Sequence, residues 1–153
     1  LVLLFALLLC TPVLAQSVDD VNATIDQEIG DHALFETAFA DLQGAVADGN
    51  AAAVAQYVLF GTPIGVGGKE ESFADQAAFE KAYPRLFTRK VVKAVTEQDY
   101  ASLFVNSEGV MFGNGELWLN GVCTDDTCAT IRVACSTQRW RFRPPSCPPA
   151  PRW

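Results

Sequence analysis

The apolar positions in the first half of the chain recur at the period of an α-helix. From His32 onward they fall at intervals of three and four residues, which predicts an amphipathic helix ending near Gly49, where a left-handed residue is favoured. Asn50 is placed to cap a second helix over "AAAVAQYVLF". The apolar positions of the first helix are Phe35, Ala38, Phe39, Leu42, Ala45 and Val46.

The segment before this helix is polar. Residues 16–31 are rich in acidic side chains, but Val18, Val21 and Ile25 again lie three and four residues apart. This spacing fits a short amphipathic helix or a frayed leader, and we assign the segment as a polar leader.

The glycine-rich stretch "GTPIGVGGKEES" follows the second helix and is interpreted as a loop with one short strand around residues 64–66. It lacks the Gly-Lys-Ser/Thr sequence of a phosphate-binding loop, so its glycines are interpreted as turn residues. Ser72 with Asp75 resembles the start of a helix over "FADQAAFEKAYPRLF", which Pro84 should end or bend. Thr88 then begins a further short helix.

From Leu103 onward the period changes to two, which is typical of β-strands. Asn114-Gly115 lies between two alternating apolar runs, and this dipeptide is a strong hairpin signal. A two-residue turn leaves one face of the hairpin aliphatic and puts Glu116 on the other. The predicted cross-strand pairs are Phe112 with Leu117, Val110 with Leu119, and Met111 with Trp118.

A second hairpin is predicted where Cys123 and Cys128 flank the residues "TDDT". In an exported protein, cysteines at this spacing lie at the distance of a cross-strand disulfide, so we expect Cys123 to be bonded to Cys128. A zinc site is the alternative. This register would put Ile131 on the Trp118 face. Either a bulge at Gly121 exchanges the two faces, or the Trp118 face is the buried one.

Residues 1–15 have the pattern of a secretory signal peptide. "LVLLFALLL" is shorter than the about 20 apolar residues that span a bilayer, and Val13 and Ala15 occupy the small-residue positions before a cleavage site. We expect cleavage after Ala15 and a periplasmic or secreted mature protein. Lipidation of Cys10 and a buried N-terminal element are the alternatives. Because the chain lacks an initiating Met, we expect it to be a fragment.

Charge is unevenly distributed along the chain. Between Asp19 and Asp126 lie 18 acidic and six basic residues, a net charge of −12, and five arginines follow. Such an acidic body repels phosphate, so we do not expect a nucleic-acid partner.

Residues 136–153 are rich in Pro and Arg, which fits a disordered tail or translation out of frame, with a Cys135–Cys147 disulfide as an option. Residues 32–135 then form a single domain.

Few residues offer catalytic chemistry. His32 is the only histidine and stands at a predicted helix start, where an exposed or capping role fits better than catalysis. The carboxylate pairs at 19–20, 70–71 and 125–126 fall in turn or leader segments, which is typical of a solvated surface. Glu116 is the one acid inside a predicted strand, so it is the candidate for an acid in a pocket, and a solvent-facing residue near a turn is the favoured alternative. We predict no metal site, no cofactor and no membrane span in the mature chain.

An apolar pocket between the helices and the sheet is the other candidate site, because ligand pockets are mostly apolar with a few polar groups. Ordinary core packing is the alternative interpretation of the same side chains. The residues that we expect to line the pocket are Tyr57, Phe79, Tyr83, Met111, Glu116 and Trp118.

Three segments together suggest a family: "FADLQGAVADGNAAAVAQYVLF", "FADQAAFEKAYPRLFTRKVVKAV" and "LFVNSEGVMFGNGELWLNGVC". Over roughly residues 33–134 the chain resembles small exported bacterial proteins of unknown function in the nuclear transport factor 2-like, cystatin-like superfamily. The resemblance implies an α+β fold in which N-terminal helices pack on a curved antiparallel sheet to form a cone with a pocket. Some members are isomerase-like or cyclase-like enzymes and others bind or dimerise, so the fold does not select the function. The catalytic Asp and Tyr of the isomerase members have no matching motif here.

We therefore expect an exported domain that binds a small apolar ligand or a protein partner without catalysis, with homodimerisation as a further option. The alternative is a small cone-fold enzyme, isomerase-like or cyclase-like, with an acidic residue in its pocket. Enzymatic activity is the less favoured hypothesis because no catalytic group can be assembled from local motifs.

Overall fold

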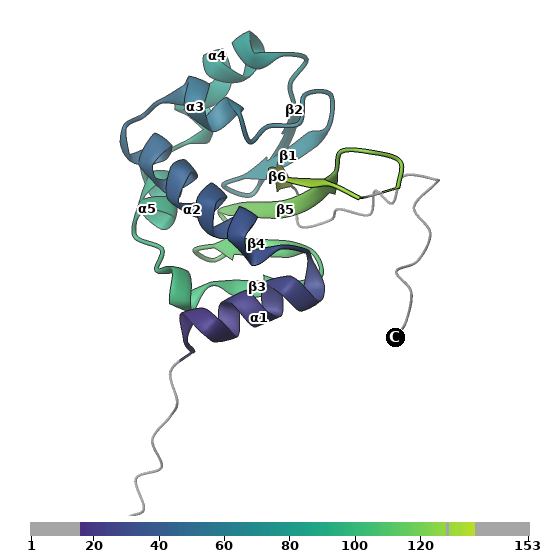
Figure 1. Ribbon diagram of the computed structural model, residues 1–153. Coiled ribbons are helices and arrows are strands. Elements are labelled where there is room, and N and C mark those ends of the chain that lie inside the picture. The colour runs from purple at the N-terminus through teal and green to yellow at the C-terminus, as the bar shows by residue number, and fades with distance from the viewer. Residues whose placement is uncertain (1–15, 128, 137–153) are drawn as a thin grey trace, which may run out of the picture.

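The computed structural model describes residues 16–127 and 129–136 as helices on one side of an antiparallel sheet (Figure 1). The expected α+β class is confirmed. The helices are α1 Val18–Glu28, α2 His32–Ala47, α3 Ala51–Ala55, α4 Gln76–Leu86, α5 Arg89–Thr96 and the short 3-10 helix η1 Tyr100–Ser102. The strands are β1 Pro63–Val66, β2 Lys69–Ser72, β3 Phe104–Asn106, β4 Gly109–Phe112, β5 Leu117–Cys123 and β6 Ile131–Ser136.

The sheet has the order β2-β1-β5-β4-β3, and β6 pairs with β5 beside β1. In Figure 1, α2 runs in front of the sheet, α1 lies along the β3 end, and α3 and α4 lie toward the β1–β2 end. Within the described residues, none of the helices has the length and apolar character that crossing a bilayer requires. The predicted signal peptide, Cys10, Cys128, Cys147 and nearly all of the predicted tail lie outside the described residues.

Helix starts follow local capping chemistry. Asn50 caps α3 as predicted, because its side-chain oxygen accepts the Ala53 N–H at 3.1 Å. The start of α4 is shifted from the prediction: Asp75, not Ser72, is the cap, and it accepts the Ala78 N–H at 2.8 Å. Pro84 does not end this helix, which continues to Leu86. One missing N–H so close to the helix end removes only one backbone hydrogen bond.

The segment before α2 folds as a helix, which decides between the two interpretations of residues 16–31. Ser17 and Asp20 form a capping box at the start of α1, with the Asp20 N–H donating to the Ser17 Oγ at 3.2 Å. Val21 and Ile25 are fully buried. Because these side chains join the core and α1 packs on β3, this part of the leader belongs to the fold.

The predicted β4–β5 register is confirmed. Phe112 pairs with Leu117, and Met111 pairs with Trp118. The connection is wider than the predicted two-residue turn, because the strands stop at Phe112 and restart at Leu117 and residues 113–116 form a four-residue loop. Gly113 adopts a φ of 60° there, a conformation that residues with a Cβ rarely adopt.

The second hairpin has a different register from the one predicted. Cys123 pairs with Ile131, so the loop spans residues 124–130 rather than the four residues between the cysteines. The pairing continues without interruption to Trp118 opposite Ser136, so the bulge at Gly121, one of the two alternatives, is absent from this ladder. The longer loop, not a bulge, keeps Ile131 on the Leu119 face. The Cys123–Cys128 disulfide stays a prediction because Cys128 is not described.

The stretch interpreted as a loop with one strand contains a hairpin. Val66 pairs with Lys69, and the two residues between them, Gly67 and Gly68, have φ values of 60° and 79°. Such positive angles match the turn that joins twisted antiparallel strands most tightly. The glycines are therefore turn residues, as predicted.

The core lies between the helices and one face of the sheet. Phe112, Leu117 and Leu119 project from this face and are at most 1% exposed. The Phe112 ring stacks on Phe39 of α2, with centroids 5.2 Å apart. Alternation along the strands turns Met111 and Trp118 to the opposite face, which we call the outer face.

Candidate functional site

The six residues predicted to line one pocket lie in four separate places. Phe79 and Tyr83 belong to an aromatic cluster on α4, where Tyr83 stacks on Phe87 with centroids 4.4 Å apart. Phe79 has no exposed surface and meets Phe73 edge to face. The Tyr83 hydroxyl is buried and has no hydrogen-bond partner in the part of the chain that the structure describes, and burial raises its pKa. This cluster packs α4 against the core.

Tyr57 follows α3 and faces the end of α2. Its hydroxyl donates a hydrogen bond to Asp41 Oδ2 at 3.2 Å, and burial together with the Asp41 charge raises its pKa to about 12. It borders a hollow of about 410 Å³ whose other lining residues include Asp48 and Asn50. A tyrosine that stays protonated to such high pH is a hydrogen-bond donor here.

Glu116 lies in the β4–β5 loop beside the start of α5. Its side chain is 6% exposed, and Oε1 forms an ion pair with Lys90 Nζ at 2.8 Å. Oε2 accepts the Asn114 N–H at 2.6 Å. The Lys90 ammonium, which donates to the carboxylate, holds the pKa of Glu116 below its usual value, although burial acts in the opposite direction. Glu116 is therefore an ionised carboxylate that holds the loop.

The groove beside Glu116 is polar and has a volume of about 410 Å³. Residues of α5, of the segment around η1 and of the β4–β5 loop line it: Lys90, Lys93, Ala94, Glu97, Gln98, Asp99, Ser102, Gly113, Asn114 and Glu116. Several of its polar groups already have partners within the protein. Gly113 N–H, for example, donates to Gln98 Oε1 at 2.9 Å.

The outer face carries a row of side chains in register across four strands. Phe104 pairs with Met111, Met111 with Trp118, and Trp118 with Ser136. Residues that are directly opposite in adjacent strands have Cβ atoms about 5 Å apart, so these four form one continuous row, the outer row. Phe104 is 52% exposed and its ring meets Trp118 edge to face at 6.4 Å.

Two polar groups of the outer row lack hydrogen-bond partners within residues 16–127 and 129–136. Trp118 is 3% exposed and Ser136 is 1% exposed, yet neither the indole Nε1 nor the Ser136 Oγ has a partner there. A buried donor without an acceptor costs about 1–3 kcal/mol. Trp118 also borders a small pocket of about 130 Å³. Its other lining residues are Gly65, Gly68, Lys69, Glu70 and Gly115.

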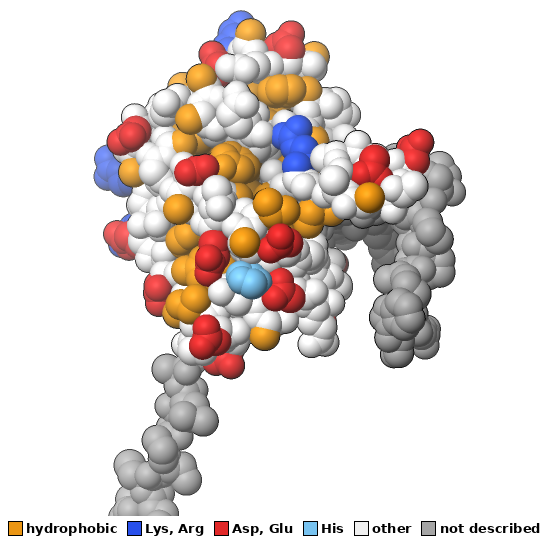
Figure 2. Space-filling view, viewed as in Figure 1, with side chains coloured by type: hydrophobic (Ala, Val, Ile, Leu, Met, Phe, Trp, Pro, Cys, Tyr) orange, Lys and Arg blue, Asp and Glu red, His pale blue; other side chains and the backbone are white. Residues whose placement is uncertain are grey.

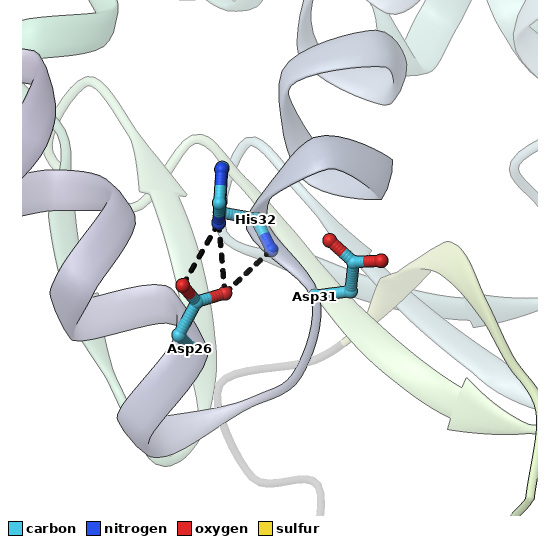
Figure 3. Close-up of side chains that lie close together, drawn as sticks. All are labelled: Asp26, Asp31 and His32. Carbon is cyan, nitrogen blue, oxygen red and sulfur yellow. Dashed lines mark hydrogen bonds and ion pairs between the residues drawn. The ribbon is translucent and has the colours of Figure 1, made fainter.

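One group in the described part of the chain brings three potential metal ligands within reach of a single ion: Asp26, Asp31 and His32, whose donor atoms lie within 4.8 Å of one another (Figure 3). His32 Nδ1 faces both oxygens of Asp26, at 2.8 and 2.9 Å, and its pKa is raised mainly by this contact. Asp31 caps α2 by accepting the Ala33 N–H. These contacts already join α1 to α2 without an ion.

Acidic side chains surround this histidine, which is pale blue in Figure 2. Asp26, Asp31 and Glu36 all favour its protonated form. His32 stands at the first position of α2, after the Asp31 cap, so its predicted place at a helix start is confirmed, and its side chain is 39% exposed.

Sequence reasoning missed the partners of two predicted residues. Lys90 lies on the exposed side of α5, and no local motif links it to Glu116. Ser136 was assigned to the tail, although it ends β6 opposite Trp118. The alternation that continues from Ile131 was the available signal for Ser136, but the incorrect register of the second hairpin obscured it.

Comparisons with known proteins give no information on function, so a functional inference depends on the fold and on the sites described above. No family model, curated protein or solved structure matches the chain. The class that the structure defines is therefore an α+β domain with helices packed on an antiparallel sheet.

Proposed function

We propose that this chain is an exported, non-catalytic binding domain of the cone-shaped nuclear transport factor 2-like type, and that it binds a protein partner on the outer face of its sheet. Export rests on the signal-peptide pattern of residues 1–15. The cone type rests on helices that cover one face of an antiparallel sheet. The observation that carries the binding function is the outer row.

The outer row has the features of a protein-binding surface. Aromatic residues and Met are enriched at interfaces, and Phe104 is the most exposed of the large apolar side chains among the described residues. Phe104 stands on strand β3 beside Met111, which is itself partly exposed. A rigid aromatic side chain loses little conformational entropy when a partner covers it.

The other two hypotheses have weaker support from the geometry. A small apolar ligand would need space in the hollow between helices and sheet, but Phe35, Phe39 and Phe112 pack there with at most 8% exposure. The enzyme hypothesis depended on Glu116 as an acid with a raised pKa, whereas its pKa is lowered and both oxygens hold partners. A protein partner on the outer face requires neither an open cavity in the core nor a protonated Glu116.

A peptide selection tests this proposal. A phage-displayed random peptide library is panned on the immobilised full chain, and the affinity of enriched peptides is measured for three forms: unchanged, Phe104→Asp and Lys93→Asp. The last substitution is the control for an added carboxylate, because it places one in the polar groove, where it changes the net charge by −2 instead of −1. Circular dichroism verifies that the variants fold.

We expect enriched peptides to lose at least about tenfold in affinity on Phe104→Asp, as for a central interface residue, and to tolerate Lys93→Asp. Peptides that tolerate Phe104→Asp but not Lys93→Asp would assign binding to the groove and refute the proposal. A selection that enriches no specific peptide would also count against it.

A further inference from the structure

The small pocket beside Trp118 has a composition that suits a defined chemical group. Three of its six lining residues are glycines, Gly65, Gly68 and Gly115, so backbone forms much of its wall. At about 130 Å³ it is smaller than the pockets of about 300–1,000 Å³ that hold drug-sized ligands. It therefore has room for a single small group, such as one peptide unit.

The indole nitrogen of Trp118, which is buried and has no hydrogen-bond partner among the described residues, lies close to this pocket. A Cβ placed on Gly115 would come within 3.6 Å of Trp118 Nε1, so the indole nitrogen lies against a glycine that lines the pocket. Indole Nε1 donates and cannot accept, so the group that would satisfy it is an acceptor. On the adjacent strand, Ser136 pairs with Trp118, and its hydroxyl also has no partner among the described residues, but Ser136 does not line this pocket.

We propose that the Trp118 pocket takes a main-chain carbonyl oxygen of the bound partner, which accepts the indole N–H. This inference rests on the proposed function and deepens it, because it makes the partner segment an extended peptide whose carbonyl inserts beside the outer row. A neutral carbonyl fits better than an anion, since Lys69 and Glu70 line the pocket with opposite charges. Both are exposed side chains on β2 and can move aside for an incoming group.

Binding is favourable because the indole N–H of the free protein is buried without an acceptor in the described part of the chain, which costs free energy. A buried donor without an acceptor is unfavourable, and a ligand oxygen that reaches it removes that cost. A peptide carbonyl is the acceptor that a protein partner supplies at every residue. The pocket thus adds a polar anchor beside the apolar surface of Phe104 and Met111.

Nuclear magnetic resonance of the full chain tests the inference. The substitutions Trp140→Phe and Trp153→Phe leave Trp118 as the only tryptophan, so its indole N–H gives a single resolved signal. The ¹⁵N-labelled protein is titrated with N-acetyl-alanine methylamide as the carbonyl probe and with sodium acetate as the anionic probe. The backbone N–H of Gly115 provides a second reporter that does not depend on the indole.

We expect the carbonyl probe to shift the Trp118 indole and Gly115 signals saturably, and acetate to shift them less. In a Trp118→Phe variant, followed through Gly115, the affinity should fall by about fivefold, the factor that one net hydrogen bond contributes. Lys93→Asp should leave this response intact, because Lys93 lines the polar groove and not this pocket.

Unshifted signals with both probes, equal binding by Trp118→Phe, or a stronger response to acetate would each overturn the inference. Its failure is distinguishable from failure of the proposed function. If library peptides depend on Phe104 but do not shift the indole signal, the proposal of a protein-binding surface stands and the proposal of a carbonyl site is refuted.

Discussion

Removal of the Glu116 carboxylate should destabilise the β4–β5 loop by a measurable amount. Its hydrogen bond from the Asn114 N–H is charge-assisted and buried, and such bonds contribute about 1.5–3 kcal/mol. The ion pair adds at most about 0.5 kcal/mol, because the Lys90 side chain is 81% exposed and well screened. We therefore expect Glu116→Ala to lower the free energy of unfolding by about 2 kcal/mol at neutral pH.

The conservative variant separates the charge from the hydrogen bond. Glu116→Gln keeps an oxygen that can accept the Asn114 N–H but loses the charge, so it should lose about 1 kcal/mol. The pKa of Glu116 is lowered in the folded protein, so its stabilising contribution is present above the usual value of 4.5 and is lost as the pH falls through the folded pKa. The difference between Glu and Gln should therefore shrink in acid.

Urea denaturation of the full chain, followed by circular dichroism between neutral pH and pH 3, measures both effects. Lys90→Met is the matched control, since it removes the exposed partner and should cost less than Glu116→Gln. The reasoning would be refuted if Glu116→Gln were as stable as the unchanged protein at neutral pH. A Glu116→Gln variant that gained stability would instead indicate a strained, functional carboxylate.

Three further predictions test the core, the Asp26–His32 contact between α1 and α2, and the buried Cys135 thiol. Phe112→Ala should cost about 3–5 kcal/mol in urea denaturation, since the ring is fully buried and stacks on Phe39; a loss below 1 kcal/mol would contradict this packing. The pKa of His32, measured by NMR, should exceed 6.5 and return toward it in Asp26→Asn; the stability from this pair is present below 6.5 and lost as the pH rises through the folded pKa. Burial raises the pKa of Cys135 to about 12, so peptide mapping should find it unalkylated by iodoacetamide at pH 8 until urea unfolds the chain.

The elements that sequence predicted well are those whose pattern and burial agree. The β4–β5 register followed from alternation, because a one-residue slip would expose Phe112 and Leu117. The helix at His32–Ala47 followed from its apolar period, because that stripe faces the sheet. In both cases one buried face fixed the arrangement.

The elements that sequence missed depend on contacts outside the local pattern. Strand β2 carries Lys69, Glu70 and Glu71 and shows no apolar alternation, because it is an edge strand that pairs only with β1. The long loop after β5 is built around Asp125, which accepts N–H donations from Thr127 and Thr130. Such side-chain bridges set loop length, and the cysteine spacing suggested a shorter one.

The candidate pocket failed to assemble as one site for a reason that bears on function. The prediction placed Tyr57, Tyr83 and Trp118 together in an apolar pocket between the helices and the sheet, but strand alternation sends Trp118 to the face opposite the helices. An isolated donor on that face is costly unless something accepts from it, and an apolar residue there would avoid the cost. The unpartnered indole and the half-exposed Phe104 lie in one row, so a single partner on the outer face would satisfy both.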